Sequence, residues 1–489
     1  MKQTQVRPLI LLGLTIVVVA GYLFSSKITY RIGFPLDDAW IHQTYARNLI
    51  EYHTWAFLPG QPSAGSTSPL WSILLSVGYL AGGIAYAWTY FLGGLCLFLL
   101  GWTGEVFFRR NNLDFKSNIP WVGIFLIGEW HLVWVSLSGM ETILFALVIL
   151  FFFLIIGAER PSWWGAGLLI GASVWVRPDG ITLLGPVLFV LLLAEGSWKE
   201  RLFMGMKVVS GFIIFFIPYL LFNYSLSGSW WPNTFYAKQA EYAVMQQIPL
   251  FERYYSILKL PMIGAGILLL PGFLFSSWKA VQEKNWSIVA AVIWWWGYSA
   301  LYALRLPVTY QHGRYLIPAM PIYFIVSLLG VSQILQKVQT EKPVQRVVSR
   351  VWLITTICVW LAFCVIGANT YSQDIGIIET EMVTTAQWVA ANTEPKSVIA
   401  VHDIGAFGFF SQRDLVDLAG LISPEVIPFI RNEQKLASYL NEKQVDYLVS
   451  FPEWYPDLVK GARQVYKTNG VFSPDAGGGN MAVYRWQSP

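Results

Sequence analysis

Two adjacent acids, Asp37 and Asp38, are the residues of this sequence best placed to do chemistry. They begin the segment DDAWIHQTYARNL, just after the first hydrophobic segment of the chain. A carboxylate beside a bilayer is costly unless it faces water or a partner, so such acids are functional candidates. One acid could serve simply as the N-cap of a helix that begins at Asp38. Two acids, with His42 one turn further on, exceed that need, and either could take a proton from a hydroxyl group.

The helix expected from Asp38 onward is amphipathic and could lie along the membrane surface. Ile41, Tyr45 and Leu49 share one face, whereas Arg47 lies on another. We predict His42, Tyr45 and Arg47 as substrate-binding residues next to the acid pair.

A third acid, Glu141, begins another hydrophobic segment, SGMETILF. A Glu at a helix start is electrostatically favourable, so this position has a purely structural explanation as well. It could instead bind substrate beside Asp37 and Asp38. These three carboxylates could also hold a hard divalent cation. Otherwise no metal or cofactor is expected, since the sequence has no P-loop, HExxH, CxxC or GxSxG pattern.

Basic residues at the ends of other hydrophobic segments complete the candidate site. They are Arg177 in VWVRPDG, Lys238 in PNTFYAK, and His312 with Arg314 in HGRYLIPAMP. Anchoring to lipid headgroups would explain any one of them. Together they predict a phosphate site, because Arg binds phosphate bidentately and Lys acts as a point charge. Asp179 could orient or neutralise Arg177, and we include it among the substrate-binding candidates.

Composition indicates a polytopic membrane protein. Hydrophobic residues make up 55% of the 489 residues and charged residues 13%, there are 24 Trp, and the mean hydropathy is +0.49. The net charge of +4 is too small to indicate nucleic-acid binding. The three cysteines, Cys96, Cys358 and Cys364, lie in hydrophobic stretches and are expected to be free thiols.

The hydrophobic pattern predicts about eleven membrane spans, each needing roughly 20 apolar residues. They are expected near 8–26, 86–108, 118–138, 141–157, 163–176, 180–195, 206–223, 260–277, 286–304, 314–333 and 350–368. Basic clusters follow every second span, and the positive-inside rule then places the N-terminus on the cytoplasmic side of the membrane. These clusters include Lys2, Arg7, Arg109, Arg110, Arg160, Lys199, Lys279, Lys337 and Lys342.

Residues 68–82 are too short for a span and are bounded by Pro69 and Gly82-Gly83. We therefore predict an external loop over 27–85 with two interfacial helices, within a membrane domain of residues 1–369. The short spans 163–176 and 180–195 are expected beside a cavity.

Residues 370–489 are more polar and predict a small external α/β domain. TEMVTTAQWVAANT and NEQKLASYLNEK have helical periodicity, and SVIAVHDIG, VDYLVSF and MAVYRW are typical of short strands.

The ordered set of motifs resembles a known family. LDDAWIHQTYARNL followed by LPGQPSAGSTSPLW resembles the first external loop of the GT-C glycosyltransferases, in particular the branch that includes the mycobacterial terminal arabinofuranosyltransferase. SGMET, VRPDG, PNTFYAK, HGRYLIPAMP and HDIGAFGFFSQRDLVDLAGL resemble the same branch. The resemblance covers nearly the whole chain.

This resemblance implies a polyprenyl-phosphate sugar donor, an external active site and an inverting transfer. It also implies that an acid of the first loop is the catalytic base, which carries over to Asp37 and Asp38; the first position, Asp37, is favoured. Asp179 stands where Glu is frequent, and Gly65-Ser66-Thr67 stands where glycine-tyrosine-threonine is common, so the sugar stays open between arabinofuranose and others.

The expected acceptor is a hydroxyl of a cell-envelope glycan, and the expected partners are the lipid-linked donor and membrane lipids. A transferase acting on protein or lipid A is an alternative. A non-enzymatic flippase of lipid-linked sugars is a second alternative. A flippase would need polar residues along a path through the spans, whereas the polar candidates gather on one side of the membrane.

Overall fold

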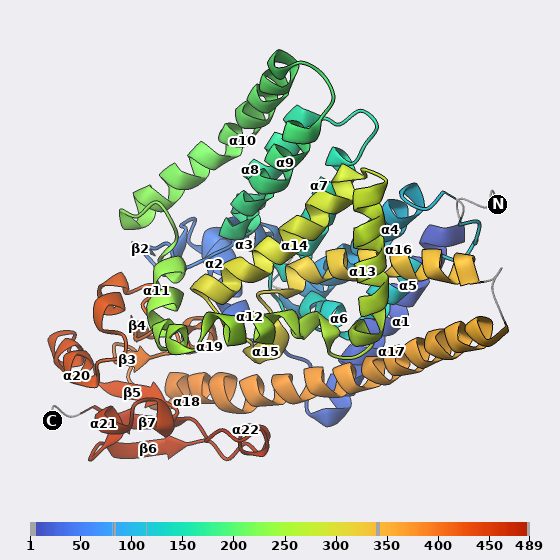
Figure 1. The fold of residues 1–489 in the computed structure, drawn as a ribbon. Coiled ribbons are helices and arrows are strands. Elements are labelled where there is room, and N and C mark those ends of the chain that lie inside the picture. The colour runs from blue at the N-terminus through green and yellow to red at the C-terminus, as the bar shows by residue number, and fades with distance from the viewer. Residues whose placement is uncertain (1–5, 81, 83–84, 114, 339–342, 487–489) are drawn as a thin grey trace.

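The computed structural model describes residues 6–80, 82, 85–113, 115–338 and 343–486. Most of these residues are helical, and a small mixed sheet stands at one end of the helices (Figure 1). The predicted fold class, a helical membrane protein with a C-terminal α/β unit, is confirmed. Lys2, Gly83 and Lys342, which entered the topology prediction, lie outside the described residues.

Six helical segments of the described chain are long and apolar enough to cross a membrane. They are α1 (Val6–Thr29), α4 (Ala85–Arg110), α10 (Trp198–Ser227), α14 (Trp286–Arg305), Tyr310–Val338 with α16 (Met320–Val338), and Pro343–Asn392 with α17 (Pro343–Ile378). A pair bent by 104°, Leu250–Met262 and α13 (Gly266–Gln282), could form a seventh.

Shorter apolar helices occupy the remaining predicted spans. They are α7 (Thr142–Ile156), α8 (Trp163–Val176) and the 3-10 turn Pro178–Leu183 with α9 (Leu184–Leu193). The predicted span 118–138 is divided into α5 (Trp121–Gly128) and α6 (Trp130–Ser136). The division falls at Glu129, whose carboxylate caps α6 by accepting a hydrogen bond from the Leu132 amide. The number of spans stays a prediction.

Helix α2 (Asp38–Glu51) begins at the predicted residue but is buried on both faces. It packs against α3 (Pro69–Leu80) and α19 (Ile404–Phe410). Gln43 on its polar side donates a hydrogen bond to Thr89 and accepts one from Tyr79. Other elements of the protein therefore cover the side of α2 that carries Gln43, so this side does not lie along the membrane surface.

The C-terminal unit contains a five-stranded sheet of order β4-β3-β5-β7-β6. Its strands are β3 (Val398–Val401), β4 (Asp414–Asp417), β5 (Tyr447–Ser450), β6 (Arg463–Lys467) and β7 (Ala482–Arg485). β3 pairs in parallel with β4 and β5, and β7 pairs antiparallel with β5 and β6. The three predicted strands are present, whereas β4 and β6 were not predicted. β4 and β6 each begin and end with a charged residue, which hides the strand pattern.

Helix α17 joins the membrane helices to this sheet without a linker. It continues past the predicted boundary at residue 369, and a wide turn at Glu379–Val383 leads into α18 (Thr384–Asn392). Glu381, buried in that turn, accepts hydrogen bonds from Thr468, Asn480 and the Met481 amide of the sheet domain. These contacts hold the sheet domain against the membrane helices.

The remaining elements connect these parts. They are β1 (Ala56–Leu58), β2 (Gln61–Pro62), α11 (Asn233–Glu241), α12 (Leu250–Leu258), α15 (Tyr310–Gly313), α20 (Glu433–Glu442), α21 (Pro456–Val459) and α22 (Phe472–Asp475).

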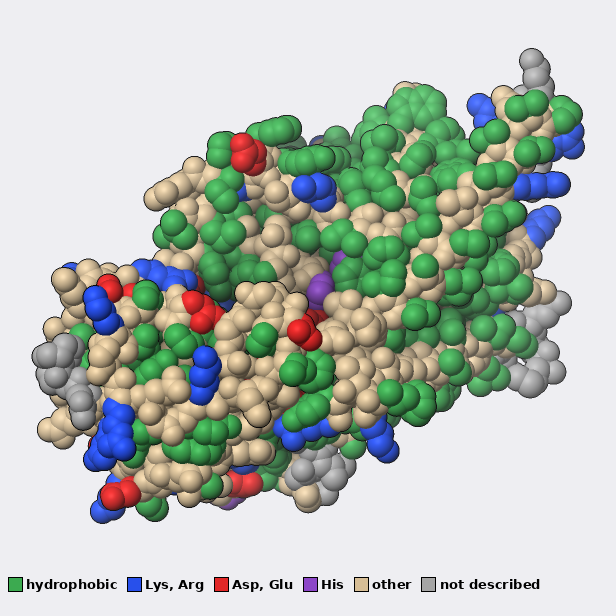
Figure 2. All heavy atoms as spheres, turned by 90° about the horizontal axis from the view of Figure 1, so that it is seen from below, with side chains coloured by type: hydrophobic (Ala, Val, Ile, Leu, Met, Phe, Trp, Pro, Cys, Tyr) green, Lys and Arg blue, Asp and Glu red, His purple; other side chains and the backbone are tan. Residues whose placement is uncertain are grey.

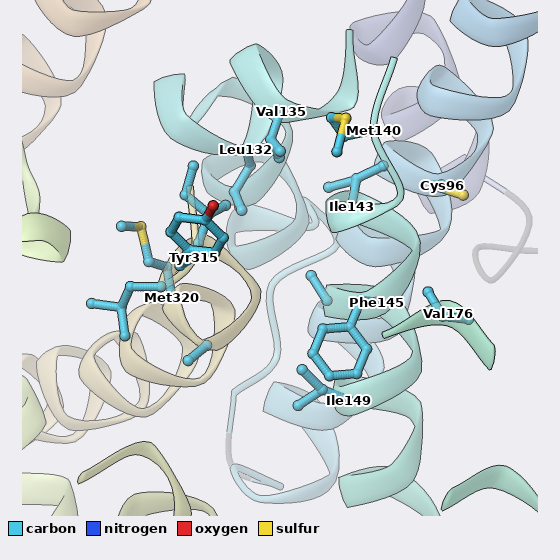
Figure 3. Packing of buried hydrophobic residues seen from close by; sticks show 14 of the residues in the cluster. Cys96, Leu132, Val135, Met140, Ile143, Phe145, Ile149, Val176, Tyr315 and Met320 are labelled. Atoms are coloured by element: carbon cyan, nitrogen blue, oxygen red, sulfur yellow. The ribbon is translucent and has the colours of Figure 1, made fainter. Parts of the chain in front are cut away.

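The apolar core continues beneath the candidate site. Figure 3 shows Phe145 and Ile149 of α7, with Tyr315 and Met320 on the chain segment that enters α16. All four are buried. Figure 2 shows apolar side chains over the helical part, while charged side chains gather on the sheet domain and at the opposite end of the helices.

Candidate active site

Asp37 stands before α2, yet its carboxylate caps a helix of the C-terminal domain. Its two oxygens accept hydrogen bonds from the amides of Gly405 (2.7 Å) and Ala406 (2.8 Å) in α19. The side chain makes no capping bond to α2, so the alternative of a simple N-cap for α2 is wrong. Burial raises the pKa of Asp37 to about 7; the charge of Asp38 adds to this rise and the two amides oppose it.

Asp38 is paired with two cations from distant segments. Its Oδ2 accepts hydrogen bonds from Arg314 Nη2 at 2.7 Å and from Lys238 Nζ at 3.1 Å. Burial alone would raise the pKa of Asp38, but the positive charges of Lys238 and Arg314 hold it well below its usual value. The two neighbouring acids thus have opposite electrostatic environments.

Arg314 keeps donors that nothing in the described part of the chain accepts. The residue is 7% exposed, and its Nε and Nη1 have no hydrogen-bond partner among the described residues. Its position follows from a tight turn, in which Gln311 and His312 adopt left-handed φ angles of 51° and 58°. Buried guanidinium donors are costly when unsatisfied, so this geometry suits an anionic ligand.

A second ionic network lies deeper, around Arg177. The guanidinium donates to Glu141 at 2.8 Å and to Asp179 at 3.0 and 3.1 Å. Tyr302 bonds to both Arg177 and Asp179, and His42 lies 3.4 Å from Glu141. Two carboxylates therefore neutralise Arg177 before any ligand binds, and Asp179 has the orienting position expected for it.

Two cavities meet at Asp38. The larger, of about 800 Å³, lies between the membrane helices and the sheet domain, and the smaller, of about 330 Å³, contains the Arg177 network. Asp38, Lys238 and Arg314 line both cavities. A carboxylate shared by two cavities can contact ligands bound on either side.

Four predicted residues lie outside these two cavities: His42, Tyr45, Arg47 and His312. Tyr45 bonds to Ser63 and the Gly65 amide, and so holds the loop after β2. Arg47 donates to the carbonyls of Gly408 and Phe409 at the end of α19. Direct substrate binding by Tyr45 and Arg47 is therefore not supported, because backbone groups occupy their polar atoms.

His312 also departs from its predicted role. Its Nε2 lies 2.8 Å from Asp374 Oδ2, and its ring packs edge-on against Trp130 and Trp134. The strained turn that directs Arg314 toward Asp38 directs His312 elsewhere. The phosphate-binding candidates in the cavities are thus Arg177, Lys238 and Arg314.

Several cavity residues were missed from the sequence. Glu241, His402, Asp403 and Arg431 line the larger cavity. His402 and Asp403 stand in the motif HDIG directly after β3, and the position after a parallel strand is the signal that could have identified them.

The predicted cation ligands do not converge. Asp37 binds backbone amides, Asp38 binds Lys238 and Arg314, and Glu141 binds Arg177. No group of three or more His, Cys, Asp or Glu residues in the described part of the chain is arranged to hold a metal ion. The divalent cation stays a prediction.

Comparison with solved structures identifies the class of fold. Two crystal structures of ArnT from Cupriavidus metallidurans share it, one bound to undecaprenyl phosphate and one in the apo state. Their TM-scores are 0.59 and 0.58 at 13% identity, with 99% and 96% of this chain covered and 98% and 97% of theirs. This protein therefore has the ArnT-like GT-C fold, which is that of a multi-pass membrane protein.

A protein of known activity is similar to this chain in sequence. The terminal beta-(1->2)-arabinofuranosyltransferase of Mycobacterium tuberculosis (strain ATCC 25618 / H37Rv) is 26% identical over 339 residues. The match covers 61% of this chain and 52% of the relative, so the chain spans about half the length of the curated protein it matches. Residues 371–484 match a family described as a domain of unknown function, DUF8728. The likeness to the GT-C arabinofuranosyltransferase branch, indicated by the motifs, is confirmed.

Proposed function

We propose that this protein is a glycosyltransferase that moves one sugar from a polyprenyl monophosphate to a hydroxyl of a cell-envelope glycan. The observation that carries the proposal is the position of Asp38 between two cavities, paired with Lys238 and Arg314. The GT-C fold and the name of the curated relative support this class of reaction. That relative also makes a pentofuranose such as arabinofuranose the first sugar to test.

The smaller cavity suits the phosphate end of the donor. Its lining includes four cationic side chains, Arg177, Lys238, Arg305 and Arg314, and three carboxylates. Arg314 and Lys238 are the best phosphate ligands, because Arg177 is already neutralised by Glu141 and Asp179. Their charge would stabilise the phosphate as the bond from its oxygen to the anomeric carbon breaks.

Asp38 is the better placed of the two acids to act as base. Both oxygens of Asp37 accept hydrogen bonds from backbone amides, whereas Asp38 Oδ1 accepts none from the described residues and the Asp38 side chain is 24% exposed. A donor phosphate would compete for Lys238 and Arg314, which would raise the basicity of Asp38. The base is thus activated only when the donor is bound.

The reaction then proceeds as a single displacement. The acceptor oxygen attacks the anomeric carbon from the face opposite the phosphate, and Asp38 takes the hydroxyl proton. The carbon–oxygen bond to phosphate breaks, and its electron pair leaves with the polyprenyl phosphate. Attack from the opposite face inverts the anomeric configuration. In-line attack requires the acceptor oxygen and the phosphate on opposite faces of the anomeric carbon, and the two cavities that meet at Asp38 offer a separate side for each.

The proposal includes an orientation of the protein in the membrane. Lys and Arg side chains gather at the ends of the helices that lie opposite the sheet domain (Figure 2). The last turn of α4 carries two such residues, Arg109 and Arg110. We assign those ends to the cytoplasm and the active site with the sheet domain to the outside of the membrane.

The test compares Asp38→Asn with Asp37→Asn in a transfer assay, using polyprenyl phosphates labelled in arabinofuranose or in a hexose. Asp38→Asn should reduce transfer by about 10²- to 10⁴-fold, the typical contribution of a general base. Its affinity for undecaprenyl phosphate should be kept or increased, because a competing carboxylate charge is removed.

Asp414→Asn is the matched control, since Asp414 is an exposed acid on β4. Full activity of Asp38→Asn would contradict the base assignment. Transport of labelled lipid in proteoliposomes without any transfer product would contradict the transferase itself.

A further inference from the structure

The structure assigns an acceptor site for uncharged glycans to the large cavity, at the edge of the C-terminal sheet. This inference rests on the proposed transferase activity and adds the chemical class of its acceptor. One wall of this cavity carries Glu241, His402, Asp403 and Trp454, none of which the donor site uses.

The position of this wall in the sheet is typical of a ligand site. Ligands of open parallel sheets bind outside the carboxyl ends of the strands, where the strand order reverses. In the order β4-β3-β5, the chain passes from β3 to β4 on one side and then to β5 on the other. Residues that follow all three strands line the cavity: Asp403 after β3, Leu421 after β4 and Trp454 after β5.

Buried polar atoms in this wall lack partners. Glu241 of α11 is 8% exposed, and its Oε2 accepts no hydrogen bond from the described residues. Its other oxygen pairs with Arg431. Asp403 Oδ2 is likewise buried and without a partner. Orphaned carboxylate oxygens in a cavity are acceptors for hydroxyl donors, which a sugar supplies in neighbouring pairs.

The neighbours of these acids add an apolar surface and a neutral polar group. Burial and the charge of Arg431 lower the pKa of His402 to about 4, so its imidazole is neutral near pH 7. Its Nδ1 lies 2.7 Å from the Tyr455 hydroxyl, and its ring contacts Trp454 edge to face. Trp454 is 39% exposed and presents an indole ring to the C–H face of a sugar.

The two cavities differ in the charge of the side chains that line them. Six carboxylate side chains line the larger cavity against three cationic ones, whereas cations are in the majority in the smaller. Burial raises the pKa values of Asp37, Asp403 and Glu241, and the positive charge of Arg431 opposes this rise at Glu241. An anionic acceptor would face like charge in the larger cavity, which disfavours phosphorylated lipids and glycans.

The test measures acceptor binding to the full-length protein in detergent with undecaprenyl phosphate present. The probes are a neutral arabinofuranosyl hexasaccharide, a neutral mannopyranosyl hexasaccharide, and each of these with one phosphomonoester. At least one neutral probe should bind, and its phosphorylated form should bind at least tenfold more weakly. Glu241→Gln and Asp403→Asn should each weaken the neutral probe about tenfold and leave the affinity for undecaprenyl phosphate unchanged.

Two further variants keep the result interpretable. Glu442→Gln, at an exposed acid on α20, should behave as wild type. Trp454→Ala replaces a partly exposed ring and tests the same wall if the buried variants do not fold. The inference is overturned if no neutral probe binds, if phosphorylated probes bind equally well, or if the wall variants leave binding unchanged. A different result would contradict the proposed function: no transfer or no undecaprenyl phosphate binding, with hexasaccharide binding intact.

Discussion

Arg314 donates a hydrogen bond of 2.7 Å to Asp38 across 276 positions of the sequence. Lys238 reaches the same oxygen across 200 positions. Each of these cations is a phosphate ligand in the proposed reaction, and Asp38 is the proposed base. Asp38 compensates part of the positive charge of Lys238 and Arg314, so donor binding and base activation are linked through a single carboxylate.

Arg314→Lys should weaken donor binding although the charge is kept. Lys cannot reproduce the fork that bonds Asp38 and Tyr315 and leaves Nε and Nη1 free for a ligand. We expect undecaprenyl phosphate to bind about 10- to 100-fold more weakly in an equilibrium titration. Arg253→Lys, on α12, is the control; equal dissociation constants for both variants would exclude Arg314 as a phosphate ligand.

The pH dependence of kcat/KM distinguishes the two acids. This parameter reports the free enzyme, in which the pKa of Asp38 is well below its usual value and that of Asp37 is about 7. With Asp38 as base the carboxylate is already ionised, so kcat/KM should stay flat between about pH 5.5 and 8. With Asp37 as base, kcat/KM would instead rise about tenfold per pH unit up to pH 7 and then level off. Such a rise, absent in Asp37→Asn, would return the role to Asp37.

The main effect expected of Arg177→Gln is a loss of folding stability. It leaves Glu141, which is fully buried, and Asp179 without their cation. Breaking a buried ion pair on one side costs about 3–5 kcal/mol. The midpoint of thermal unfolding in detergent should fall strongly, and the double variant Glu141→Gln/Arg177→Gln should recover part of the loss. Additive losses would show that the two residues are not coupled.

Arg47→Met should lower stability and leave catalysis intact. The guanidinium satisfies two carbonyls at the end of α19 and lies 4.8 Å from the centre of the Phe409 ring. Loss of a charged hydrogen bond of this kind costs about 1.5–3 kcal/mol. Thermal unfolding should show the decrease, with Lys435→Met as an exposed control and unchanged KM for donor and acceptor. A large rise in KM would restore the predicted substrate role of Arg47.

Local patterns in the sequence were sufficient for part of this site. The charge placed at helix starts and ends identified Asp38, Glu141, Arg177, Lys238 and Arg314, and all five line the smaller cavity. Isolated charges at the ends of apolar helices are conspicuous, because each requires a partner or water. Tyr45 and Arg47 carried no such signal, and helical position alone could not show that backbone groups bind them.

The sequence by itself determined that the chain is a helical membrane protein, that α2 begins at Asp38 and that a small α/β domain follows the spans. These features depend on hydropathy and periodicity within short windows. Only the tertiary structure decided which partner each acid has: Asp37 caps a helix 368 positions away, while Asp38 holds two cations. The physical reason is that pairing and burial depend on how remote segments pack, and it is this packing that gives adjacent carboxylates opposite environments.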